Sequence, residues 1–371
     1  MVARAAPGAG AAGRQGVEAM FIGAVAMVCP VGLDAASACA AKRAGISAFG
    51  NLPYRDNAGE PVVGAIVPGL DWTLPRASRL GRMLARCVAG LAAERPDLAW
   101  ERVPILVCLA EPDRPGGSAD LAPVIVEHLQ EVLGMRFDAG ASGVFASGHV
   151  AGFQALREAR RLVHQGLAPA CVVCGADSML NAATLLWLDR HYRLKTPANR
   201  DGAIPGEAAA AVLVETAPAG DAAVEVAGLG FGLEDAPLLS EAPLLGRGLT
   251  AAVRSALGEA SLGLHEIDLR LSDVTGELYG FKELPLMEGR LMRVVRKQAQ
   301  PLWHWAEAIG DTGAASGIAQ LVLAHQACRK RYAPGDTALC LCSSLAGERA
   351  AAVLRNLLPP SAGHGAQGHG L

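Results

Sequence analysis

Short apolar runs alternate with longer amphipathic segments along most of the chain. The runs are rich in Val, Ile, Leu and Cys, and their continuous apolarity predicts strands covered on both faces. The segments between them place apolar residues at helical spacing. This alternation is typical of an α/β fold. We predict strands at 20–29, 103–109, 170–174, 209–215, 224–231, 267–271 and 337–342, and helices at 35–44, 76–93, 121–133, 147–165, 245–260 and 314–330.

A glycine-opened helix followed by a small-residue strand occurs twice, at 147–175 and again at 313–343. This repetition indicates an internal duplication, with a boundary in the turn-forming stretch 216–224. We therefore predict an N-terminal half at 17–220 and a C-terminal half at 221–357. Residues 1–16 and 358–371 lack apolar periodicity and are interpreted as flexible tails, and His364 and His369 in the second tail have no fixed metal-binding geometry. We predict no metal site.

The charge balance and the cysteine content exclude several classes of protein. The chain of 371 residues has 33 Lys and Arg against 36 Asp and Glu, and no segment collects the cations that a nucleic-acid groove needs. Nine scattered cysteines do not form a disulfide framework and favour a reducing cytoplasm. The apolar run at 20–28 is too short to cross a bilayer and is better explained as a first strand than as a signal peptide. We expect a cytoplasmic protein with neither nucleic acid nor membrane as a partner.

Four segments, taken together, resemble β-ketoacyl-acyl-carrier-protein synthases of the thiolase superfamily. They are MVCPVGLDAASACAAKRAGIS at 27–47, ASGHVAGFQALREARRLVHQGLAPACVVCGADSML at 146–180, DGAIPGEAAAAVLVE at 201–215 and AIGDTGAASGIAQLVLA at 308–324. Each is weak alone, but their order and intervals match. The resemblance implies a thiolase-like, five-layered α-β-α-β-α fold with two duplicated halves, and we expect no cofactor.

The resemblance fails at the three catalytic positions of that family. Those synthases use a cysteine just before the central helix and two histidines from later loops. An ungapped alignment puts Phe145 at the cysteine position, and the nearest loop matches put Asp273 and Asp311 at the histidine positions. A phenyl ring cannot form a thioester, and ionised carboxylates repel a developing oxyanion. We expect the ring of Phe145 to plug the inner end of the former acyl channel.

The two aspartates allow two interpretations. They could form an acid/base pair, since neighbouring carboxylates push their pKa values apart. Alternatively, Asp273 and Asp311 cap their own turns by accepting backbone N–H bonds, and we favour this interpretation because no nucleophile lies beside them.

Four further residues near the same motifs are candidate binding residues. Ser147 stands where the central helix is predicted to begin, and helix capping is its most common role there. His149 lies in the first turn of that helix and either faces the pocket or is structural. Thr312 and Gly313 follow Asp311 in the second loop.

The cysteines of the predicted strands are interpreted as small buried residues. Cys171 and Cys174 are three apart on a strand, so their side chains should point to opposite faces. Cys340 and Cys342 should share one face.

Three functional hypotheses follow. The first is a non-catalytic thiolase-fold protein that acts as a binding, adaptor or partner subunit, either for an active synthase or for a type VI secretion effector. It would form a homodimer, or a heterodimer with another thiolase-like subunit, through the strand at 170–174, and an acyl carrier protein is another candidate partner. An exposed apolar patch away from the dimer face would favour the adaptor.

The second hypothesis is an enzyme of the 3-oxoacyl-carrier synthase family with an altered site for acyl transfer, decarboxylation or hydrolysis. A tunnel reaching both aspartates would favour it. The third is an ordinary condensing enzyme with misaligned motifs. It needs a cysteine near the start of the central helix, and none lies between Cys108 and Cys171.

Overall fold

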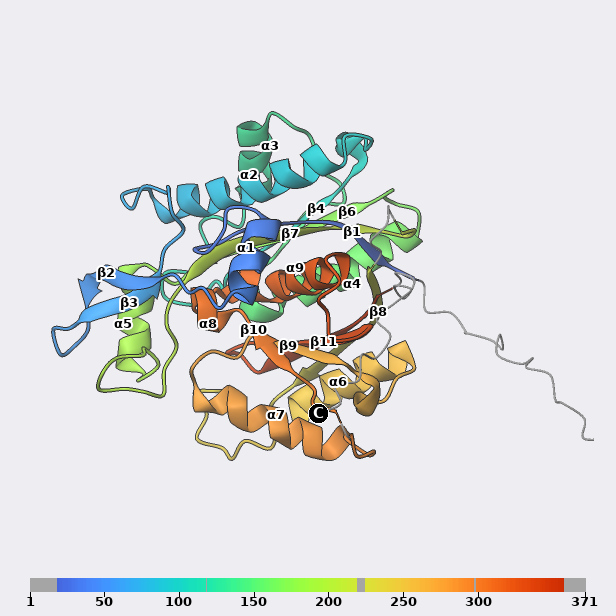
Figure 1. Cartoon of the computed structure of the whole chain (residues 1–371). Helices are drawn as coiled ribbons and strands as arrows, with labels where there is room; N and C mark the ends of the chain where they lie inside the picture. Colours follow the sequence, from blue (N-terminus) through green and yellow to red (C-terminus); the bar gives the residue numbers. More distant parts are fainter. Residues whose placement is uncertain (1–18, 118, 219–223, 297, 357–371) are drawn as a thin grey trace, which may run out of the picture.

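The computed structural model describes residues 19–117, 119–218, 224–296 and 298–356. Ten of its strands are connected by hydrogen bonds into one continuous series (Figure 1). From one edge to the other the strands are β10 (Leu302–His304), β9 (Leu269–Ser272), β11 (Thr337–Ser343), β12 (Glu348–Asn356), β8 (Val224–Leu233), β1 (Phe21–Val28), β7 (Glu207–Glu215), β6 (Cys171–Ser178), β4 (Ile105–Cys108) and β5 (Gly143–Phe145).

The junction in the middle of this order is short, because β1 and β8 pair only at Phe21 and Ile22. It divides the order into two groups of five strands. When the strands of each group are counted along the chain, both groups have the order third, second, fourth, fifth, first. In both groups the fifth strand, β7 or β12, runs antiparallel to its neighbours. The two groups therefore share one topology, as an internal duplication requires. The predicted tails, with His364 and His369, lie outside the described residues, as does most of the predicted boundary.

Helices cover and separate the two strand layers, which gives five layers in Figure 1. On the first layer the outer helices are α2 (Arg76–Glu94) and α3 (Ile125–Leu133), and on the second they are α6 (Arg247–Ala260) and α7 (Leu278–Leu291). Between the layers lie α4 (Ala151–His164) and α9 (Ser316–Arg329), with α1 (Ala35–Arg43) beside α9. The structure thus confirms the predicted five-layered α-β-α-β-α fold.

The middle layer is the best-buried part of the molecule. Every residue of α9 from Ser316 to Ala327 is buried, because this helix contacts strands of both layers as well as α4. Most of its residues are apolar, and its buried polar residues include Gln320 and His325. The contact with α4 is close: a Cβ atom on Gly152 would lie 2.9 Å from Cγ1 of Ile318. These two helices fix the positions of the loops that precede them.

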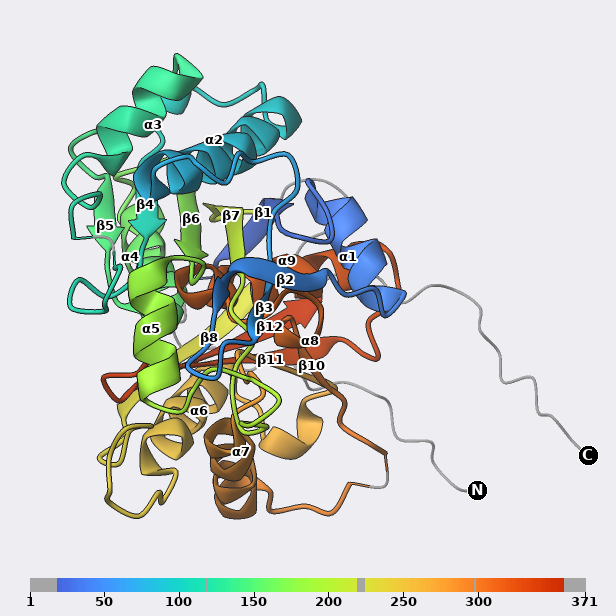
Figure 2. The same ribbon diagram turned by 90° about the vertical axis from the view of Figure 1, so that its left-hand side faces the viewer.

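A smaller unit projects beside the layers, where β2 (Phe49–Arg55) and β3 (Pro61–Ala65) form a hairpin close to α5 (Ala182–Arg190) (Figure 2). The hairpin and α5 share a small core that includes Leu52 and Leu185. The remaining elements are α8 (Ala306–Ile309) and the 3₁₀ turns η1 (Trp100–Arg102), η2 (Gly148–Val150), η3 (Leu264–Glu266) and η4 (Gly313–Ala315). No helix within the described ranges is long and apolar enough to cross a membrane.

Two predictions about the central elements were wrong. The central helix begins at Ala151, because η2 precedes it where the helix was predicted to start. The strand at 170–174, which became β6, cannot join subunits edge to edge because it is paired on both sides, with β4 and β7. The free edges of the strand order belong to β5 and β10.

Candidate functional site

A cavity of about 70 Å³ lies where three segments of the two halves meet. Asp273 directly follows β9, Asp311 lies between α8 and η4, and His149 lies in η2 just before α4. All three residues line this cavity. The structure therefore brings together two of the family's site positions, and it adds a histidine from a third segment.

His149 and Asp311 form a buried pair, with Nε2 of His149 2.8 Å from Oδ1 of Asp311. Burial disfavours the charged imidazolium, but the charge of Asp311 outweighs it and raises the pKa of His149 to about 9. Burial also disfavours the charged carboxylate, but His149 outweighs it and lowers the pKa of Asp311 below its ordinary value. At neutral pH the pair is therefore an imidazolium and a carboxylate.

Asp273 faces the same cavity with a different environment. Its Oδ2 accepts a hydrogen bond of 2.7 Å from the backbone N–H of Ser343. Burial raises the pKa of Asp273, and the nearby Asp311 adds to this rise while His149 opposes it. The two aspartates thus differ in their tendency to hold a proton, as the acid/base interpretation requires.

The capping interpretation also has support in the hydrogen bonds. Oδ1 of Asp311 accepts the N–H of Gly313, which lies in its own turn, at 3.0 Å. Asp273 instead accepts from Ser343 at the end of β11, which lies 70 residues away in the chain. Asp311 is thus both a turn cap and a partner of His149.

The remaining charges on the cavity wall are paired with one another. Nε of Arg349 donates to Oε1 of Glu283 at 2.8 Å, and both side chains are buried. Arg193 donates two hydrogen bonds to Glu277, of 2.7 and 2.8 Å. The cavity of about 70 Å³ has room for several water molecules.

Four candidates from the sequence lie outside the cavity wall: Phe145, Ser147, Thr312 and Gly313. Phe145 ends β5, and its side chain is half-buried against the central core. Ser147 makes no capping hydrogen bond through its side chain, so the predicted cap is wrong. The hydroxyl of Thr312 lies 3.1 Å from that of Ser316, and Gly313 begins η4 with a φ of +48°.

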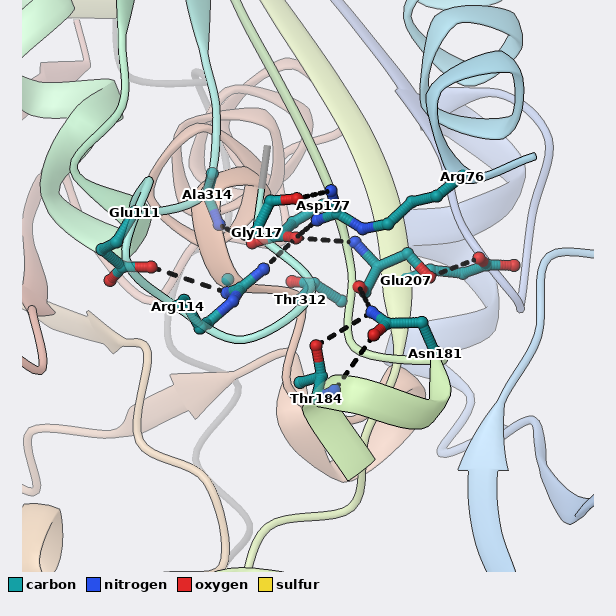
Figure 3. A network of polar contacts seen from close by, with 12 residues as sticks. Arg76, Glu111, Arg114, Gly117, Asp177, Asn181, Thr184, Glu207, Thr312 and Ala314 are labelled. Carbon is teal, nitrogen blue, oxygen red and sulfur yellow. Dashed lines mark hydrogen bonds and ion pairs between the residues drawn. The ribbon is translucent and has the colours of Figure 1, made fainter. Parts of the chain in front are cut away.

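A polar network around Asp177 reaches the turn before α9 (Figure 3). Asp177, at the end of β6, accepts hydrogen bonds from Arg76 at 3.1 Å, from Arg114 at 2.5 Å and from the N–H of Ala314 at 3.1 Å. Glu111 lies on the other side of Arg114 in the same network, with its Oε2 3.6 Å from Nη1. Sequence reasoning missed the network, because Asp177 and Ala314 lie in separate motifs while Arg76, Glu111 and Arg114 lie in none.

The cysteines form no part of the cavity wall. Cys171 and Cys174 belong to the cores on opposite sides of β6, whereas Cys340 and Cys342 belong to one core, as their spacing predicted. Burial raises the pKa of every cysteine, to about 12 for Cys29 and about 11 for the half-buried Cys328. None of the nine is therefore a thiolate at neutral pH. Across the described part of the chain, no group of three or more His, Cys, Asp or Glu side chains could hold a metal ion.

Comparisons with known proteins place the chain structurally. No family model matches its sequence, and no curated protein matches it. Among solved structures, it is similar to an oxazolomycin ketosynthase domain of Streptomyces albus JA3453, with a TM-score of 0.77 at 16% identity over 93% of this chain and 76% of that one. It is also similar to the ketosynthase ApeO in complex with its chain length factor ApeC from Xenorhabdus doucetiae, with a TM-score of 0.72 at 15% identity over 91% of this chain and 98% of that one.

A third similar structure is the ishigamide ketosynthase/chain length factor, with a TM-score of 0.67 at 22% identity over 91% of this chain and 99% of that one. Each of the three matches covers at least 91% of this chain. The chain therefore has the thiolase-like fold of the ketosynthases, as its four sequence segments predicted.

Proposed function

We propose that this protein is a non-catalytic, ketosynthase-like subunit that acts by binding another protein. The observation that carries this proposal is the wall of the cavity, which has two aspartates at the family's histidine positions and no cysteine among its described residues. Condensation needs a thiolate to accept the acyl group and hydrogen-bond donors for the oxyanion. Here the imidazolium of His149 is already engaged by Asp311.

The electrostatics also oppose the substrate of that reaction. A malonyl group carries a carboxylate, and the cavity of about 70 Å³ offers it no free positive charge, because the imidazolium of His149 is paired with Asp311. Arg193 and Arg349 are not free either, because each is already paired with a glutamate. The site therefore disfavours both binding of the nucleophile precursor and formation of the oxyanion.

The partner we favour is a second thiolase-fold chain, either identical or different. Two of the similar structures are ketosynthases with chain length factors. In this chain the exposed backbone edge of the first layer is β5, which pairs only with β4. The carbonyl of Phe145 accepts a hydrogen bond from Leu109, so the polar backbone groups of its neighbour Val144 point toward the free edge. This edge supports strand pairing with a partner.

An acyl carrier protein and a type VI secretion effector are two other candidate partners. A similar structure is a polyketide ketosynthase with its acyl-carrier protein, AntDE:AntF. A carrier protein or a type VI secretion effector would instead bind a surface away from β5. Purified protein, mixed in turn with a candidate synthase, a carrier and an effector, distinguishes these partners by the mass of the complex.

The absence of catalysis is tested by incubating the protein with acylated carrier and malonyl carrier and measuring its intact mass. An active condensing enzyme assayed in parallel is the positive control. We expect no acyl adduct and no condensed product. A stable adduct on any residue would overturn the proposal.

A second candidate function is hydrolysis or decarboxylation in the same cavity. It is favoured by one observation: Asp273 and Asp311 line a single cavity and have pKa values shifted in opposite directions. Release of carbon dioxide or free acid from an acyl thioester, abolished by Asp273→Asn, would support this function over the first.

A further inference from the structure

The turn between β5 and α4 leaves a space that a neighbouring carboxylate fills. Gly148 has a φ of +57°, and a Cβ atom on it would lie 2.0 Å from Oε1 and 2.7 Å from Oε2 of Glu111. No side chain fits at position 148 while Glu111 keeps this place. The space directly before α4 is therefore occupied by the carboxylate of Glu111, which comes from the loop after β4.

Glu111 is held there without hydrogen bonds. The residue is 8% exposed, and neither carboxylate oxygen has a hydrogen-bond partner among the described residues. Its closest cation is Arg114, with Nη1 at 3.6 Å. Burial of a carboxylate without hydrogen bonds is costly unless another favourable interaction offsets it. The positive end of α4 and the guanidinium of Arg114 supply that interaction.

The start of α9 provides an internal comparison. Gly313 has a φ of +48°, and a Cβ atom on it would lie 2.0 Å from Oδ2 of Asp177. Asp177 is fully hydrogen-bonded, however, since it accepts from Ala314, Arg114 and Arg76. A carboxylate thus lies against a glycine before both helices. The one before α9 is hydrogen-bonded, whereas the one before α4 is not.

The space beside Glu111 adjoins the cavity, because His149 follows Gly148 and lines the cavity wall. The charged groups around His149 are Glu111, Asp273 and Asp311, and the charge of each one favours the imidazolium. Neither Glu111 nor Arg114 lines the cavity wall.

We propose that Glu111 is a built-in anion, which occupies the space before α4 that would otherwise bind the carboxylate or oxyanion of a ligand. This inference rests on the proposed function, because it explains how the helix start is closed to an acyl group. The ligand that we expect in this space is a small planar anion, since a carboxylate already occupies it beside Arg114.

Replacement of Glu111 by alanine tests the inference through anion rescue. In the E111A protein we expect sodium formate to raise the melting temperature in a dose-dependent way, while sodium chloride at equal ionic strength does not. The matched control is E111Q, which keeps the side-chain volume and removes the charge. Because the space stays filled in E111Q and in the wild type, formate should leave the melting temperature of both proteins unchanged. No formate effect in E111A, or an equal effect in E111Q, would overturn the proposal.

A second measurement does not depend on anion binding. The G148A substitution places a methyl group against Glu111, so it should lower the melting temperature more in the wild type than in the E111A background. The strain of a positive φ is common to both backgrounds and cancels in this comparison. Equal losses would show that Glu111 does not fill the space.

These measurements separate the two proposals. If the wild type forms an acyl adduct while formate still rescues E111A, the proposed function is wrong and the built-in anion stands. If no adduct forms and formate has no effect, the non-catalytic role stands and the anion site is wrong.

Discussion

Nε2 of His149 lies 2.8 Å from Oδ1 of Asp311, although the two residues are 162 positions apart in the chain. The contact joins the start of α4, from one half, to the loop before α9, from the other. Both side chains are buried, so each charge depends on the other for stabilisation. The pair ties the two halves together at the cavity.

Removal of one member of this pair should destabilise the protein strongly. We expect Asp311→Asn to lower the free energy of unfolding by about 3 kcal/mol, because it leaves a buried histidine without its counter-charge. Urea unfolding measures the change. Asp97→Asn, which removes the exposed partner of Arg95, serves as a control that should change little. A similar small change in both variants would show that the His149 pair contributes no more than an exposed one.

The same pair should make stability depend on alkaline pH. The pKa of His149 is raised from 6.5 to about 9 in the folded chain, so its contribution is complete below pH 6.5 and is lost as the pH rises through 9. The difference in melting temperature between the wild type and His149→Asn should therefore shrink between pH 7 and 10. A difference that stays constant across this range would contradict the raised pKa.

His325 on α9 should produce the opposite dependence. Its two ring nitrogens have no hydrogen-bond partner among the described residues, and burial lowers its pKa from 6.5 to about 4. Between pH 6.5 and 4, His325 is protonated in the unfolded chain but stays neutral in the folded chain. The free energy of unfolding should therefore fall by roughly 3 kcal/mol over this range. Chemical unfolding of His325→Leu at several pH values should show a smaller acid loss. An identical loss in both proteins would assign the effect to other groups.

Phe145 should contribute packing energy and no chemistry. Its ring is half-buried, so Phe145→Ala should cost about 2 kcal/mol, less than the roughly 3 to 5 kcal/mol of a fully buried phenylalanine. Phe145→Cys should remain without condensing activity, because Phe145 does not line the cavity that holds Asp273 and Asp311. Thermal unfolding and intact mass after incubation with acylated carrier measure the two effects. An acyl adduct on the new cysteine would place position 145 at a working site.

Pairing along β5 should be sensitive to Val144, whose backbone N–H points toward the free edge. If β5 joins two chains, light scattering should give a dimer at micromolar concentration for the wild type and a monomer for Val144→Pro, which removes that donor. The control is Asn51→Pro on β2, away from this edge, which should leave the dimer intact. A monomeric wild type, with no candidate partner bound, would contradict the proposed strand pairing.

The sequence determined the strands and helices whose burial pattern is local. The continuous apolarity of β1, β6 and β7 and the helical spacing of apolar residues in α2 predicted these elements within a few residues, because burial on two faces or on one face leaves a local pattern. The opposite orientation of Cys171 and Cys174 also follows from strand geometry alone. Two elements whose residues do not clearly favour a strand or a helix were not predicted from the sequence. The strand β12 (Glu348–Asn356) is alanine-rich, and α7 (Leu278–Leu291) contains Pro285.

Only the tertiary structure decided which residues form the site. The motifs placed Asp273, Asp311 and His149 in three separate segments, but only the packing of the layers pairs Asp311 with His149. The group beside Gly148, Glu111, comes from a segment with no recognisable motif. Strand pairing likewise decided that β6 is internal and β5 is an edge, since a sequence of apolar residues is equally suited to either position. Hydrophobic patterning fixes which face of an element is buried, whereas contacts between distant charged groups depend on how complete layers pack, and no local pattern encodes that packing.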